Sequence, residues 1–158
     1  MRAGGRGSLP GLPRRLWIVP VVLLFLVISV ELARYLSASG TERGAVVSLL
    51  QAQARGDATA MLDQLDACAK DRACVAQVRR NAARLRAKGQ PKILLLESGA
   101  AYTLKSSTGL TRVVWSDVKG KGATYVQCVV VRKQWSFLDG AKVSLRRIGP
   151  RIGNEASC

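Results

Sequence analysis

An apolar run near the N-terminus constrains this chain more than any other feature. Residues 16–30 contain no charged side chain, and the apolar character continues to residue 36 with Glu31 and Arg34 interposed. A helix needs about 20 residues to span the core of a bilayer, and the spacing of Glu31 and Arg34 lets them pair at the far interface. The sequence therefore predicts a transmembrane helix over residues 16–36.

The arginines that precede this run predict its orientation. Residues 1–15 contain four arginines and no acidic residue, so the positive-inside rule places the N-terminus in the cytoplasm. The same segment is rich in Gly and Pro and is expected to be a disordered basic tail. The side chains expected at the two membrane interfaces are Arg14, Arg15, Trp17, Glu31, Arg34 and Tyr35. Residues 37–158 then form an extracytoplasmic domain held at the cell membrane, with the bilayer as its first partner.

A cleaved signal peptide is the alternative interpretation of the apolar run. Residues 37–39 offer the small side chains that a signal peptidase accepts. Against it, the run is long for a signal peptide, and Glu31 and Arg34 are unfavourable close to a cleavage site. Both interpretations place the body of the chain outside the cytoplasm.

The cysteines favour the same compartment. All four follow the apolar run, at Cys68, Cys74, Cys128 and Cys158, and an even number in an exported domain is typical of two disulfides. Proximity favours Cys68 with Cys74, which leaves Cys128 with Cys158, although four free or buried thiols are the alternative. In one continuous helix the first pair would lie about 10 Å apart, beyond disulfide reach, so a turn is expected between them, with Asp71 capping a new helix.

The body divides into a helical part and a strand-rich part. A polar hinge over residues 37–41 is expected to start the first helix, Gly56 to end it and Asp57 to cap a second, with a third running from Asp71 to about Lys88. After this the chain becomes rich in β-branched and aromatic residues separated by glycine and polar clusters. Strands are predicted near residues 92–97, 100–105, 110–117, 123–134 and 142–148. Helices followed by an antiparallel sheet indicate an α+β fold.

The phrase AQARGDATAMLDQL, in which a helix breaks at Gly56 and Asp57 and resumes at once, resembles the start of small nuclear transport factor two-like (cystatin-like) domains. The resemblance implies three helices packed on a curved antiparallel sheet of four to five strands. Many bacterial members are small exported or membrane-anchored proteins, and some similar anchored domains help to assemble secretion machinery of the bacterial cell envelope. The cone formed by the sheet can hold a ligand or an active site in this superfamily.

The absence of histidine argues against most enzymatic mechanisms. It removes the commonest general base, the usual activator of a nucleophilic Ser or Cys, and the commonest zinc ligand. The sequence also contains no glycine-rich phosphate loop and no metal-ligand cluster, so neither a cofactor nor catalysis is expected. The main hypothesis is a non-enzymatic anchored domain that binds a partner or helps to assemble an envelope complex. The first alternative is a cone that binds a ligand or is weakly catalytic.

A pilin-like structural subunit is the second alternative. Such subunits join an N-terminal membrane helix to an antiparallel sheet that a C-terminal disulfide closes, a role that Cys128 and Cys158 would fill. The leader motif typical of pilins is a Gly followed at once by an apolar run with Glu at its fifth position. That motif is absent here, because prolines and arginines follow Gly11.

The body is strongly basic. Five of the 25 basic and one of the 10 acidic residues precede residue 37, so the remaining chain has a net charge of +11. The third helix offers the best candidate surface for an anionic lipid, a wall polymer or an acidic partner. Its arginines are Arg79, Arg80, Arg84 and Arg86. A solvated helix face in an arginine-rich chain is the alternative, and nucleic acid is not expected because this helix has no aromatic residue for base stacking.

Overall fold

The computed structural model describes residues 14–103, 105–117, 123–136 and 140–158, and for residues 14–17 and 34–39 it describes the backbone alone. The predicted disordered tail over residues 1–15 thus lies outside the described residues except for its last two, which begin a helix. That helix, α1 (Arg14–Arg55), is 42 residues long, which corresponds to about 60 Å.

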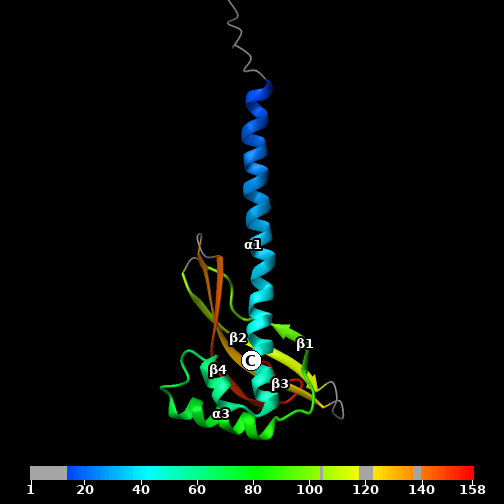
Figure 1. Ribbon diagram of the computed structural model, residues 1–158, viewed down its shortest axis with the longest axis vertical. Helices are drawn as coiled ribbons and strands as arrows, with labels where there is room; N and C mark the ends of the chain where they lie inside the picture. The colour runs from blue at the N-terminus through cyan, green and yellow to red at the C-terminus, as the bar shows by residue number, and fades with distance from the viewer. Residues whose placement is uncertain (1–13, 104, 118–122, 137–139) are drawn as a thin grey trace, which may run out of the picture.

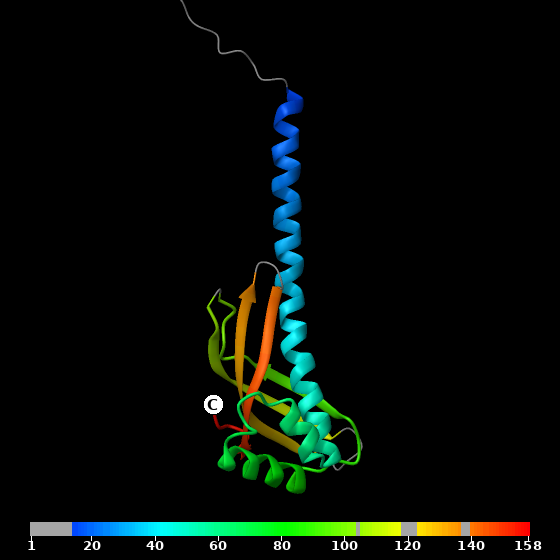
Figure 2. The same cartoon turned by 60° about the vertical axis from the view of Figure 1, so that its left-hand side comes forward.

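The N-terminal half of α1 projects away from the rest of the domain (Figure 1) and has no other element beside it in a second view (Figure 2). We call residues 18–33 the helical arm. The predicted hinge over residues 37–41 is wrong, because α1 continues through it. Its Ser, Gly and Thr residues each cost a helix at most about 1 kcal/mol, and a helix that is already formed on both sides propagates across them.

The predicted transmembrane helix over residues 16–36 is not found. Across the described parts of the chain, no helix is both long enough and apolar enough to cross a membrane. Residues 16–36 are part of α1, and from Ile18 to Ala33 every residue is exposed apart from the half-buried Ser29.

Two aspartates begin the short helices, as predicted. Gly56, at a φ of 77°, ends α1, and Asp57 accepts a hydrogen bond of 3.0 Å from the Ala60 amide at the start of α2 (Ala58–Asp63). Asp71 caps α3 (Arg72–Arg84) by accepting from two backbone amides. The turn before Asp71 brings the Cα atoms of Cys68 and Cys74 to 5.2 Å, and the predicted disulfide between them is present.

The strands form one antiparallel sheet in the order β1-β2-β3-β4. Their bounds are β1 Pro91–Glu97, β2 Ser107–Asp117, β3 Thr124–Ser136 and β4 Gly140–Ile152. Register shifts interrupt the pairing once between β1 and β2 and twice between β3 and β4. Such bulges bend strands. The order of helices and then antiparallel strands confirms the predicted α+β fold.

The predicted strand over residues 100–105 is wrong. Its described residues are irregular, although the Thr103 carbonyl accepts a hydrogen bond of 2.9 Å from the Trp135 amide of β3. The backbones at Gly99 and Gly109 approach so closely that a Cβ atom on either would collide with the other segment. Residues 98–103 therefore pass close to the start of β2 without forming a strand.

The three helices and one face of the sheet share a single core. The C-terminal half of α1 supplies Val46, Leu49 and Leu50, and β2 supplies Trp115, all of which are fully buried. Val113, Val129 and Val131 continue the core across β2 and β3. The side chains of the domain itself therefore occupy the space between helices and sheet.

Candidate functional site

A groove between α3 and the end of β4 brings basic side chains together. Its volume is about 350 Å³, and α3 lies at the end of the domain opposite the helical arm in both views (Figures 1 and 2). Arg80, Arg84 and Arg151 line it. The remaining lining residues are Gln77, Asn81, Leu85 and Pro150.

In the part of the chain that the structure describes, no carboxylate neutralises the groove arginines. Arg80 donates a hydrogen bond of 2.7 Å to the side-chain oxygen of Gln77, and the guanidinium of Arg151 lies 5.1 Å from the ring centre of Tyr125. Within the described residues, neither of these arginines nor Arg84 forms a salt bridge with a carboxylate. Glu155, the acidic residue nearest to Arg151 in the sequence, lines a different pocket that Arg151 also borders. The groove thus brings three positive charges together without a carboxylate partner among the described residues.

Buried amides hold the two walls of the groove in place. Gln127 of β3 donates to the Gly149 carbonyl of β4 at 3.3 Å, and Asn81 of α3 donates to the same carbonyl at 2.9 Å. Gln53 of α1 exchanges hydrogen bonds with Gln127, which also accepts one of 2.9 Å from the Trp115 indole. This network fixes the end of β4 against α3, and Arg151 lies two residues beyond the shared carbonyl.

The structure divides the predicted arginine surface. Arg80 and Arg84 are four residues apart on one face of α3 and line the groove, whereas Arg79 and Arg86 are exposed but do not line it. The guanidinium of Arg86 lies against Gly56 at the end of α1. Sequence reasoning missed Arg151, because only the tertiary fold brings the end of β4 beside α3.

A second polar site is buried where the helical arm joins the domain. Glu42 of α1 and Lys133 of β3 form a salt bridge of 2.6 Å with only 4% and 3% of their side chains exposed. Thr111 of β2 donates to the other carboxylate oxygen of Glu42 at 2.8 Å, and Lys133 also donates to the Ser98 hydroxyl. We call these residues, with Tyr102, the ionic cluster.

Register explains why charged residues lie inside. Glu42 precedes the core residue Val46 by four positions on α1, and Lys133 follows Val131 by two positions on β3, so both share a face with the core. Alternation along β3 was visible in the sequence, and extending it by one step would have placed Lys133 inward. Nothing in the sequence pointed to Glu42 as its partner.

Tyr102 completes the ionic cluster. Its ring lies 4.9 Å from the ammonium nitrogen of Lys133 and packs edge-on against Trp135 with ring centres 6.5 Å apart. Burial, with a smaller contribution from the negative charge of Glu42, raises the pKa of Tyr102 to about 12. The phenol is therefore neutral at physiological pH and acts as an aromatic wall for the ammonium.

Ser98 and Lys133 are in contact, and a lysine beside a serine can act as the base that activates a nucleophilic hydroxyl. An ammonium paired with a carboxylate has no lone pair with which to take a proton from a hydroxyl. Glu42 therefore opposes that chemistry. In the described part of the chain every buried side-chain nitrogen and oxygen has a hydrogen-bond partner, so the cluster is suited to holding α1 on the sheet.

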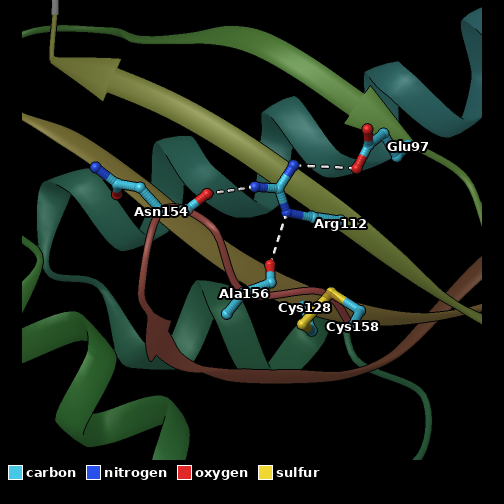
Figure 3. A network of polar contacts seen from close by, with 6 residues as sticks. All are labelled: Glu97, Arg112, Cys128, Asn154, Ala156 and Cys158. Carbon is cyan, nitrogen blue, oxygen red and sulfur yellow. Dashed lines mark hydrogen bonds and ion pairs between the residues drawn. A yellow bond between two sulfur atoms is a disulfide. The ribbon is translucent and has the colours of Figure 1, made fainter.

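The C-terminal segment is fastened to the outer face of the sheet (Figure 3). The predicted disulfide between Cys128 and Cys158 is present. Arg112, which pairs in register with Cys128, donates to the carbonyls of Asn154 at 2.6 Å and Ala156 at 2.9 Å and forms a salt bridge of 3.0 Å with Glu97. One guanidinium and one disulfide together hold the last residues of the chain.

The remaining predicted sites lie mostly outside the described residues. This applies to the side chains of five expected interface residues, namely Arg14, Arg15, Trp17, Arg34 and Tyr35. The sixth, Glu31, is exposed on the helical arm. Among the residues that the structure describes, no group of three or more His, Cys, Asp or Glu side chains could hold a metal ion.

Comparisons of the chain with protein-family models, with curated proteins and with solved structures each gave no match. The resemblance to nuclear transport factor two-like domains therefore stays a prediction.

Proposed function

We propose that this protein is a single-pass, membrane-anchored domain that binds a partner outside the cytoplasm and helps to assemble a complex of the cell envelope. The helical arm carries the proposal. Twelve large apolar side chains between Ile18 and Leu32 are 48–68% exposed, a surface that a soluble monomer rarely presents. Burying the exposed halves of these side chains in lipid would contribute on the order of 10 kcal/mol.

The disulfides support an extracytoplasmic location for the domain. Cys68–Cys74 and Cys128–Cys158 both follow the arm, and disulfides persist in oxidising compartments. The arginines before the arm favour a cytoplasmic N-terminus. Both arguments give the same orientation, with the arm in the bilayer and residues 37–158 outside.

A binding role, without catalysis or a cofactor, agrees best with the interior of the domain. Trp115 and the core residues around it fill the space between helices and sheet, and Lys133 is paired with Glu42. Three helices on one face of an antiparallel sheet is also the arrangement expected of a nuclear transport factor two-like domain. We propose that the domain is of this kind and that its outer surface binds the partner.

Fractionation of cells that express the full chain tests the anchor. The protein should stay with the membranes through alkaline extraction, and Leu24→Arg should lower the retained fraction, because a charge in the middle of the arm is costly in lipid. Ser48→Arg is the matched control, since it adds the same charge at an exposed position of α1 beyond the arm. Release of the unaltered chain, or equal release of both variants, would contradict the anchor.

A pilin-like subunit is a second candidate, favoured by the unbroken course of α1. One helix provides the exposed arm and the core face beneath the sheet, and the Cys128–Cys158 disulfide holds the C-terminus. This candidate requires removal of a leader before the arm. The intact mass of the membrane-extracted chain decides, because an unprocessed mass rules the candidate out.

A further inference from the structure

We infer that the groove between α3 and β4 binds a carboxylate-rich segment of a partner protein, an inference that rests on the proposed anchoring and partner-binding function. Arg80, Arg84 and Arg151 face one volume of about 350 Å³ from two different elements. Within the described residues none of them has a carboxylate partner. Guanidinium groups bind carboxylates through paired hydrogen bonds, so three of them around one groove form a receptor for several acidic side chains.

The position of the groove argues against lipid headgroups as its ligand. The helical arm ends at Ala33, and α1 continues to Arg55, which at 1.5 Å per residue carries the chain about 33 Å farther. The segment after α3 packs at that far end, where the Ala87 amide donates to the Ala54 carbonyl at 3.0 Å. The Debye length at physiological salt is about 8 Å, so the membrane that holds the arm lies several screening lengths away.

The rest of the lining favours a polypeptide over an anionic polymer. Leu85 and Pro150 add apolar surface, and Gln77 and Asn81 add side-chain amides. A peptide offers carboxylates, main-chain amides and apolar side chains together, whereas a phosphate-rich polymer offers little besides charge. The groove volume of about 350 Å³ lies at the low end of the range of ligand-binding pockets.

The groove is tested with the full chain in nanodiscs of phosphatidylcholine, which carries no net charge, by titration with a short oligoglutamate peptide. We expect Arg80→Ala and Arg84→Ala each to weaken binding about tenfold, the loss of one paired hydrogen-bonded contact. Arg79→Ala is the matched control, because it removes the same charge from the same helix outside the groove. It should change binding by less than about twofold, as expected of a charge screened by solvent. All three variants should fold, since alanine is the best helix former.

Three results would overturn the inference. They are equal weakening by Arg79→Ala, tighter binding of polyphosphate than of oligoglutamate, and binding to phosphatidylglycerol vesicles that depends on Arg84. The same titration in detergent micelles does not require the arm to hold a bilayer. If the chain does not enter nanodiscs but binds the peptide in micelles, the anchor alone is refuted. If the chain enters nanodiscs but does not bind the peptide in micelles, the groove alone is refuted.

Discussion

Replacing Lys133 by Met should strongly destabilise the domain. The substitution keeps most of the side-chain volume but removes the ammonium that lies 2.6 Å from the Glu42 carboxylate. Glu42 would then be a buried anion with the Thr111 hydroxyl as its remaining donor in the ionic cluster. A carboxylate that has lost both water and its counter-ion cannot be accommodated without reorganisation.

The size of the effect follows from the burial of the pair. Arg147 and Asp71 are as close, at 2.7 Å, but their side chains are 57% and 30% exposed, and such surface pairs contribute about 0.2–1 kcal/mol. The side chains of Glu42 and Lys133 are at most 4% exposed, and removing one partner of a buried pair costs about 3–5 kcal/mol. For a domain of this size that loss corresponds to a fall in Tm of roughly 10–20 °C.

Thermal and urea unfolding of the full chain in micelles, followed by circular dichroism, measures this cost. Arg132→Met is the control, because it removes a cation from an exposed position of the same strand and should cost less than about 0.5 kcal/mol. The double variant Glu42→Leu with Lys133→Met removes both charges and should recover most of the loss. A cost below about 1 kcal/mol for Lys133→Met alone would refute the reasoning, since it would mean that water reaches the pair.

The C-terminal fastening and Tyr102 give further predictions. Cys128→Ser removes the disulfide between two residues 30 positions apart and should lower the free energy of unfolding by about 3–4 kcal/mol. Urea unfolding beside the unaltered oxidised chain measures this loss. No change would mean that the bond does not form. Arg112 donates to two carbonyls of the C-terminal segment and forms a salt bridge with Glu97. Arg112→Met should therefore loosen this segment, seen as faster amide hydrogen exchange over residues 153–158 with little change in the core. The raised pKa of Tyr102, about 12 against 10.0 for the free side chain, favours the neutral phenol in the folded state, so its contribution to stability is complete below pH 10 and is lost as pH rises through 12. In a tyrosinate absorbance titration, Tyr102→Phe should remove a component with a midpoint near 12, and a missing component with a midpoint near 10 would contradict the burial argument.

Local signals in the sequence predicted three helix boundaries and both disulfides, whereas α3 ends at Arg84, four residues before the predicted end at Lys88. Gly56 ends α1 with a positive φ, and Asp57 and Asp71 begin α2 and α3, because caps depend on a few adjacent residues. The disulfide between Cys68 and Cys74 could be predicted because the two cysteines are six residues apart and a turn before Asp71 brings them together. The α+β order followed from the change of hydrophobic period after α3.

Features that depend on more than a few adjacent residues were missed. The continuity of α1 through residues 37–41 reflects support from helix on both sides, which outweighs weak local breakers. Gly99 lies against Leu110 of β2, and the predicted strand over residues 100–105 that follows it is irregular where it is described. The link between Glu42 and Lys133 joins residues 91 positions apart, and Arg151 reaches the groove through the tertiary fold. No local pattern contains that information.

Labelling of introduced cysteines with a membrane-impermeant maleimide tests the proposed membrane topology. The native cysteines of the described chain are all in disulfides, so Ser48→Cys on α1 beyond the arm and Ser8→Cys before it can each be read against an unaltered background. We expect Ser48→Cys to be labelled in intact cells and Ser8→Cys to be labelled only after permeabilisation. Labelling of both in intact cells, or of Ser8→Cys alone, would contradict an extracytoplasmic domain anchored by its helical arm.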